Sequence, residues 1–238
     1  MFTALLSSVL TGLQFLVWAG STGVGMYAIK LASLLGYRVV TTASPHNFEL
    51  VKSLGASAVF DYKDPKVSTK IQEWIKDQNI GPLTKGFDTI SESKDSTAAN
   101  GAVIESSIKL SLQAFGDAEG MLVTLCTLSL MSVGLVRLTG GNTVVPPAPE
   151  FKGEGQKVRV NHILIYSALK PQNDDFGLMA EWYRLLPSWI EEGRLGAGVV
   201  PLDKQFSGLG QLDSALEFVR QGRVSGHKVV VDVDFEAK

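Results

Sequence analysis

The stretch that decides the fold is FLVWAGSTGVGMYAIKLASLLGYRVVTTASPHN, which occupies residues 15–47. It opens with an apolar run, passes through a glycine-rich turn, and then places apolar residues at helical spacing as far as Gly36. A second apolar run, residues 37–42, follows and ends in polar residues. Short apolar runs are typical of parallel strands buried on both faces. A strand, a glycine turn and a helix in this order predict the first unit of a doubly wound sheet.

The same alternation continues along the chain. Further strands are predicted at residues 58–62, 87–90, 121–126 and 158–168, and helices at residues 47–54 and 67–76. Alternating strands and helices predict a Rossmann-type, doubly wound parallel α/β sheet of about six strands. We expect a short N-terminal remnant at 1–12, a nucleotide-binding domain at 13–168 and a C-terminal segment at 169–238. That segment should hold helices at 178–192 and 208–221 and a closing strand at 228–233.

Two stretches fit this alternation poorly. Residues 92–116 are rich in Ser and Ala, with a weak helical pattern at 102–112, and are long for one connecting helix. We interpret part of them as an insertion. Residues 139–156 are rich in Gly and Pro, which predicts a loop.

Composition narrows the class of protein. The chain has 238 residues, of which 45% are hydrophobic and 19% charged, with a formal net charge of -2. These values predict a soluble globular protein, and the absence of a basic block argues against a nucleic-acid partner. The single cysteine, Cys126, allows neither an internal disulfide nor a cysteine-built zinc site, and fits a reducing, cytoplasmic compartment. The three histidines are scattered, so no metal site is predicted; they are His46, His162 and His227.

The first residues allow two interpretations. They are apolar and end in small residues, as a secretory signal does, or they form a short helix that leads into a buried strand. No Lys or Arg precedes Lys30, which favours the second interpretation. Polar and glycine residues interrupt the apolar run, so a membrane span is not expected.

The turn at residues 19–25, AGSTGVG, carries the strongest chemical signal. Glycines allow a sharp turn and a close approach to a pyrophosphate, and the following helix presents unpaired N–H groups to it. The simpler alternative is a turn that only connects a strand to a helix. A Ser–His–Asp triad is not favoured, because the turn lacks a nucleophile-elbow pattern.

The end of the second predicted strand bears on the choice of cofactor. NAD sites usually place Asp or Glu there to hold the ribose hydroxyls, whereas this strand ends in Thr42, Ala43 and Ser44. A carboxylate would repel the 2′-phosphate of NADPH, so its absence favours NADPH. The alternative is that Ser44 and Asn47 only cap the next helix.

Two stretches carry a family resemblance: WAGSTGVGMYAIKLASLLGYRVVTTASPHNFELVKSLGASAVFDYKD, residues 18–64, and LDSALEFVRQGRVSGHKVVVDV, residues 212–233. They resemble the zinc-independent branch of the medium-chain dehydrogenase/reductase superfamily, and especially fungal enoyl reductases and quinone-oxidoreductase-like proteins that act with polyketide synthases. The resemblance implies pyrophosphate contacts at Ser21, Thr22, Gly23 and Val24. It implies adenosine-phosphate contacts at Ser44, Pro45, His46 and Asn47, with Tyr62 beside them. Leu125 and Cys126 would approach the nicotinamide ribose, and Val224 and Ser225 would reach back to the cofactor.

The resemblance also implies a reaction. It is hydride transfer from NADPH to an activated double bond or a quinone, on a small-molecule or acyl-thioester substrate, in secondary metabolism. A partner synthase or a homodimer is the implied assembly. Relatives carry an N-terminal catalytic barrel that is largely missing here, and the C-terminal segment would return toward it. No catalytic side chain is assigned. Two alternatives stay open: a non-catalytic NADPH-binding or scaffold module, and a truncated gene model with no stable product.

The two tryptophans of the helix predicted at 178–192 have a simpler interpretation. Trp182 and Trp189 are seven residues apart and therefore share one helical face. We expect them to pack in the core or at an interface.

Overall fold

The computed structural model describes residues 13–79, 81–92, 95–97, 101, 103–125, 157–163 and 175–233. Its centre is a parallel sheet with the strand order β3-β2-β1-β4-β7-β8. These strands are β1 (Gln14–Trp18), β2 (Arg38–Ala43), β3 (Ala56–Asp61), β4 (Lys85–Asp88), β7 (Gly120–Leu125) and β8 (Val158–Ile163). The predicted Rossmann-type fold of six parallel strands is confirmed.

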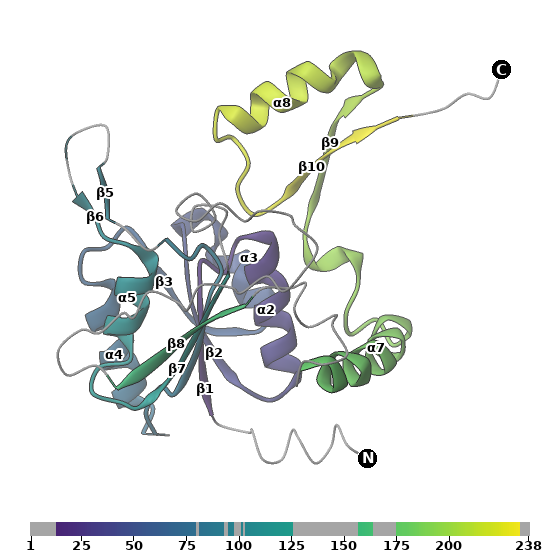
Figure 1. The fold of residues 1–238 in the computed structure, drawn as a ribbon. Coiled ribbons are helices and arrows are strands. Elements are labelled where there is room, and N and C mark those ends of the chain that lie inside the picture. Colours follow the sequence, from purple (N-terminus) through teal and green to yellow (C-terminus); the bar gives the residue numbers. More distant parts are fainter. Residues whose placement is uncertain are drawn as a thin grey trace, which may run out of the picture.

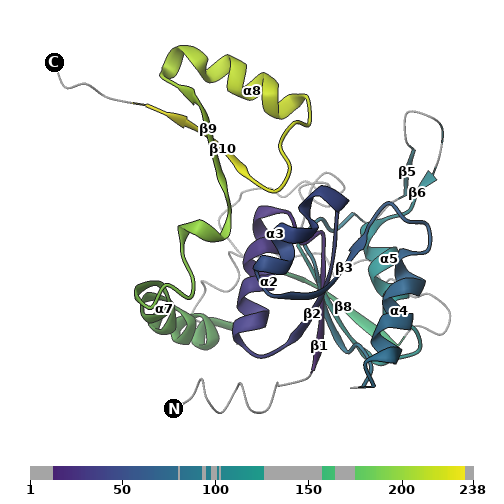
Figure 2. The same cartoon turned by 180° about the vertical axis from the view of Figure 1, so that it is seen from behind.

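Helices cover both faces of this sheet. Figures 1 and 2 show α2 (Gly23–Leu34) and α3 (Phe48–Ser53) on one face, and α4 (Val67–Asp77) and α5 (Ser107–Ala114) on the other. Successive strand residues point to opposite faces. Leu16 of β1 therefore belongs to the core beneath α4 and α5, and Val17 to the core beneath α2 and α3. This layering leaves the ends of the strands as the open edges of the domain.

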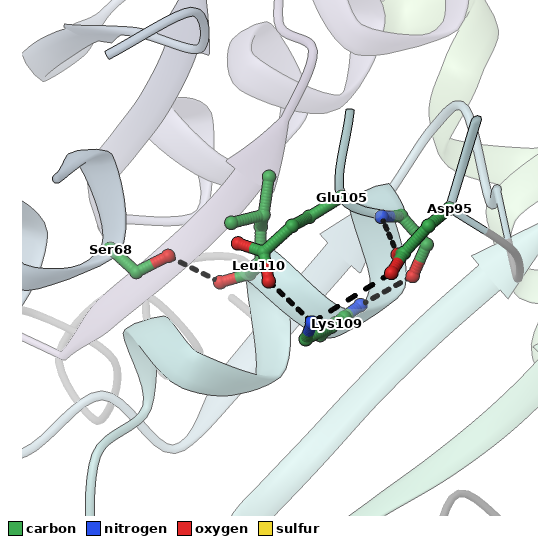
Figure 3. Close-up of polar contacts among 6 residues, drawn as sticks. Ser68, Asp95, Glu105, Lys109 and Leu110 are labelled. Atoms are coloured by element: carbon green, nitrogen blue, oxygen red, sulfur yellow. Dashed lines mark hydrogen bonds and ion pairs between the residues drawn. The ribbon is translucent and has the colours of Figure 1, made fainter. Parts of the chain in front are cut away.

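The insertion predicted within residues 92–116 includes a small antiparallel pair, β5 (Ser96–Thr97) with β6 (Val103–Ile104). Figure 3 shows how it is attached to the domain. The carboxylate of Asp95 accepts a hydrogen bond from the backbone N–H of Ser106 at 2.8 Å and lies 3.8 Å from the ammonium of Lys109. Ser68 of α4 donates to the carbonyl of Leu110 at 2.8 Å and so ties α4 to α5. The helix predicted at 102–112 in fact begins at Ser107, because Ser106 caps it.

The C-terminal segment continues from a helix beside α2 to a helix and two strands beyond the carboxyl ends of the sheet (Figure 1). It contains α7 (Asp175–Glu191), β9 (Leu202–Ser207), α8 (Leu212–Arg220) and β10 (Lys228–Asp232). Trp182 and Trp189 of α7 pack edge to face at 5.7 Å, and both belong to the core beneath α2, as expected for a shared apolar face. Strand β9, which pairs with β10 in parallel, is not predicted by the sequence because its residues LDKQFS are mostly exposed and carry no apolar run.

Several boundaries differ from the predictions. Strand β4 covers residues 85–88 rather than 87–90, so Thr89 and Ile90 lie beyond its end. Helix α8 begins at Leu212, after a short 3-10 turn, Leu209–Gln211. The remnant at 1–12, the loop at 139–156 and the domain boundary at 168 lie outside the described residues.

Candidate functional site

The glycine turn lies at the carboxyl edge of the sheet, between the end of β1 and the start of α2. From β1 the chain adds β2 and β3 on one side, and later adds β4, β7 and β8 on the other. The turn therefore sits at the topological switch point, where open α/β sheets bind their ligands. This location agrees with the nucleotide-binding turn that the sequence predicts.

The glycines of the turn have different functions. A Cβ atom at Gly25 would lie 2.4 Å from the carbonyl oxygen of Ala19, and one at Gly20 would lie 2.1 Å from Oγ1 of Thr41. Both positions are closed by the protein itself. A Cβ at Gly23 would meet only Cε of Lys228, at 4.0 Å. Gly23 is therefore the glycine that leaves open space for a ligand.

Unpaired backbone donors gather at this open space. Thr22 caps α2, and its Oγ1 accepts the backbone N–H of Gly25 at 2.9 Å. Within the part of the chain that the structure describes, the N–H groups of Ser21, Gly23 and Val24 have no hydrogen-bond partner. The first turn of α2 carries no acidic residue. The free donors and the positive end of the helix dipole together make the turn a fitting anion site.

The end of β2 gathers a second group of the predicted residues. Ser44 precedes the 3-10 turn Pro45–Asn47, and Asn47 leads into α3. Neither Ser44 nor Asn47 makes a side-chain capping hydrogen bond, so the interpretation of these residues as helix caps alone is wrong. Instead, Nδ2 of Asn47 donates to Oγ of Ser225 at 2.9 Å, and Nε2 of His46 lies 2.9 Å from the same oxygen.

This contact brings the C-terminal segment to the nucleotide end of the sheet. Gly226 follows Ser225 with a φ of +73°, and a Cβ there would lie 2.5 Å from Oδ1 of Asn47. Only glycine allows that close approach in that conformation. Ser225 therefore lies beside His46 and Asn47 at the end of β2, and the contact of Val224 and Ser225 with the cofactor stays a prediction.

The remaining predicted residues are less closely assembled. Tyr62 follows β3, whose Asp61 pairs with Ala43, so it stands next to the end of β2 and is exposed. Leu125 is the last residue of β7, at the same edge of the sheet, and its side chain is not among the described ones. Cys126 lies outside the described residues.

Sequence reasoning did not identify the residues at the end of β4. Asp88 is fully buried, and its carboxylate accepts hydrogen bonds from Oγ of Ser107 at 2.6 Å and from the N–H groups of Ile90 and Ser91 at 3.0 Å. Burial raises the pKa of Asp88, and these hydrogen bonds oppose the rise. Thr89, beside it, contacts the glycine turn. The available signal was a polar pair, Asp88 and Thr89, inside the apolar run predicted as a strand at 87–90.

Lys228 was also missed. Its aliphatic chain lies over Gly23, while its ammonium has no carboxylate within ion-pair distance and no hydrogen bond among the described residues. A cation at the positive end of a helix is electrostatically unfavourable unless an anion lies between them. The arrangement at the turn is therefore complementary to an anionic group.

Two features are absent from the described part of the chain. No group of three His, Cys, Asp or Glu side chains there could hold a metal ion. No described helix is long and apolar enough to cross a membrane.

Comparisons with known proteins identify relatives of this chain. The family model described as zinc-binding dehydrogenase matches residues 23–111. The trans-enoyl reductase ACTTS2 of Alternaria alternata is 32% identical over 229 residues, covering 93% of this chain and 55% of that protein. The chain thus spans about half the length of the curated relatives it matches.

Solved structures show the same fold. The quinone oxidoreductase of Coxiella burnetii has a TM-score of 0.57 at 20% identity, over 98% of this chain and 56% of that one. A mycobacterial protein solved in complex with NADPH has a TM-score of 0.58 at 20% identity, over 95% of this chain and 59% of that one. The chain belongs to the medium-chain dehydrogenase/reductase superfamily, in the branch of the fungal trans-enoyl reductases and quinone-oxidoreductase-like proteins.

Proposed function

We propose that this chain binds NADPH at the glycine turn and acts as the cofactor-binding part of a reductase. The observation that carries the proposal is the open anion site at the switch point: three unpaired amides, a helix N-terminus without a carboxylate, and the side chain of Lys228. The diphosphate of a dinucleotide has the charge and the shape that this arrangement fits. A mycobacterial neighbour of the same fold was solved in complex with NADPH, which supports this choice of cofactor.

The phosphorylated form of the cofactor fits the second group of residues. The described positions 43–47 carry no carboxylate, and they present the side chains of Ser44, His46 and Asn47 next to Ser225. A 2′-phosphate would find donors there and no repelling charge. Tyr62 stands beside this group and would flank the adenine end of the cofactor. In this arrangement Leu125 would approach the nicotinamide ribose.

The reaction we propose is hydride transfer from bound NADPH to an activated C=C bond or a quinone. The names of the relatives, trans-enoyl reductases and quinone oxidoreductases, support these two acceptor classes. The cofactor supplies the hydride, and the protein orients it and excludes water. An acyl thioester carried by a partner synthase, in secondary metabolism, is the substrate class of the enoyl-reductase variant. A homodimer is the simplest assembly, and the cytoplasm the proposed compartment.

A non-catalytic NADPH-binding or scaffold module is the second candidate. It rests on the same open anion site at the glycine turn, because binding the cofactor requires only these donors. Such a module would bind NADPH without oxidising it.

One experiment separates these candidates. The purified chain is titrated with NADPH and, in parallel, with NADH, and cofactor fluorescence is followed. A quinone or an enoyl thioester is then added, and the absorbance of the reduced cofactor is recorded. Binding that favours NADPH, followed by its oxidation, supports the reductase. Binding without oxidation by either acceptor supports the module, and no binding of either cofactor refutes both.

A further inference from the structure

The glycine turn contains a residue in an unfavourable backbone conformation. Ala19 has a φ of +60°, in the left-handed region that non-glycine residues rarely adopt. Such a conformation is unfavourable and persists only where its surroundings hold it firmly. The contacts that hold Ala19 therefore set the shape of the turn.

Strand β2 supplies the first set of these contacts. Oγ1 of Thr42 accepts the N–H of Ala19 at 2.9 Å, and the carbonyl of Thr42 accepts the N–H of Gly20 at 2.8 Å. Both bonds fix the amide side of the turn. The carbonyl of Ala19 accepts the backbone N–H of Thr22 at 3.1 Å, and further contacts to this carbonyl and to the side chain of Thr22 come from another strand.

Thr89 supplies the second set, from the other side of the switch point. Its Oγ1 lies 2.9 Å from the carbonyl oxygen of Trp18, 3.2 Å from that of Ala19 and 2.9 Å from Oγ1 of Thr22. Oγ1 of Thr22 also lies 3.0 Å from the carbonyl oxygen of Ala19. Each of the two hydroxyls donates its one proton to an oxygen within this group. The pair Thr22 and Thr89 therefore links the end of β1 to the end of β4.

The position of Thr89 is itself fixed. The neighbouring Asp88 is fully buried, and its carboxylate holds the N–H groups of Ile90 and Ser91 and the hydroxyl of Ser107. The backbone on both sides of Thr89 is therefore anchored. Thr89 is itself 7% exposed, so water has little access to replace its contacts.

We infer that Thr89 is a positioning residue for the cofactor diphosphate. Its hydroxyl holds Thr22, and Thr22 caps α2 and so aims the amides of Gly23 and Val24 into the open space. This inference rests on the proposed NADPH site at the turn. It adds Thr89, which follows β4, to the residues that determine cofactor affinity.

The test compares Thr89→Val with Thr89→Ser in the full chain. Valine keeps the branched shape and loses the hydroxyl, whereas serine keeps the hydroxyl. We expect Thr89→Val to raise the NADPH dissociation constant about tenfold, which is the size of effect that one hydrogen bond of about 1.4 kcal/mol produces. The dissociation constant of Thr89→Ser should stay within about threefold of the parent value, since serine keeps the hydroxyl that makes a hydrogen bond of this strength.

A matched control removes a buried hydroxyl far from the turn. Ser68 donates to the carbonyl of Leu110 between α4 and α5, so Ser68→Ala should lower the unfolding midpoint in urea and leave the dissociation constant unchanged. An unchanged constant in Thr89→Val, or equal losses in the valine and serine variants, would overturn the inference. A weakened constant in Ser68→Ala would also overturn it, because affinity would then follow stability alone.

A second measurement does not need the cofactor. Amide hydrogen exchange of the ligand-free protein reports the turn directly, through the N–H groups of Gly20 and Gly25, which are bonded to Thr42 and Thr22. We expect exchange at Gly25 to be about tenfold faster in Thr89→Val than in Thr89→Ser, because opening of the cap costs about one hydrogen bond less. Equal exchange in the two variants would refute the positioning role. Failure of the parent protein to bind NADPH would refute the proposed function and leave this readout to decide the role of Thr89.

Discussion

Gly25 offers the sharpest test of how the turn is built. In Gly25→Ala the new Cβ would lie 2.4 Å from the carbonyl oxygen of Ala19 and 2.8 Å from Cα of Gly20. Ordinary contact between such atoms begins at about 3.5 Å, so the start of α2 must move away from the turn by about 1 Å. Both neighbours are backbone atoms, and no side-chain rotation relieves the clash.

The expected loss of stability follows from these contacts. Overpacking of this kind costs about 1–3 kcal/mol. Movement of the helix start would also lengthen the 2.9 Å bond from the N–H of Gly25 to Oγ1 of Thr22, and the loss of a cap costs about 1 kcal/mol. The better helix propensity of alanine returns about 1 kcal/mol. The net expectation is a loss of about 1–3 kcal/mol, within the range for overpacked cores.

The assay is urea unfolding, with Gly23→Ala as the matched control. The control makes the same substitution two residues away, where a Cβ meets only Cε of Lys228 at 4.0 Å. With a slope of about 2 kcal/mol per molar urea, the midpoint of Gly25→Ala should fall by about 0.5–1.5 M, whereas that of Gly23→Ala should stay the same or rise slightly. NADPH affinity in Gly25→Ala should fall on the order of 100-fold, because a displacement of about 1 Å misaligns the amides. Equal midpoints for the two variants would refute the described turn geometry.

Three further changes test the site. Gly23→Asp should abolish NADPH binding in a fluorescence titration while circular dichroism stays unchanged, because its carboxylate would occupy the open space meant for the diphosphate; unchanged affinity would refute the assigned turn. Lys228→Gln should weaken NADPH about tenfold at low salt and less at high salt, since salt screens an exposed charge; a loss that is independent of salt would contradict this electrostatic role. Burial raises the pKa of Asp88 above 3.8, so the folded protein retains a proton there that the unfolded chain releases. The stability from this group is then full below that value and is lost as pH rises through the raised pKa. In urea unfolding at a series of pH values, the parent protein should therefore lose stability relative to Asp88→Asn as the pH rises through the raised pKa of Asp88. A stability difference between the two proteins that is independent of pH would count against the raised pKa.

Much of the fold could be predicted because its signals are local. Apolar runs and helical spacing located β1, β2, β3, β7 and the helices beside them. Strand β9 was missed, since an exposed strand carries no apolar pattern to detect. The end of β4 was predicted at residue 90 rather than 88, because the apolar Ile90 resembles a strand residue. In the structure Asp88 ends the strand, since its carboxylate accepts the N–H groups of Ile90 and Ser91.

The candidate site divides in the same way. The glycine turn and the acid-free end of β2 are properties of short stretches, and the sequence by itself determined both. Only the tertiary structure decided that Thr89 meets Thr22 across 67 residues, that Ser225 meets His46 across 179, and that Lys228 lies over Gly23. Each of these contacts depends on strand order and on the return of the C-terminal segment. Both are set by packing among distant apolar faces, and no local pattern records which distant faces will meet.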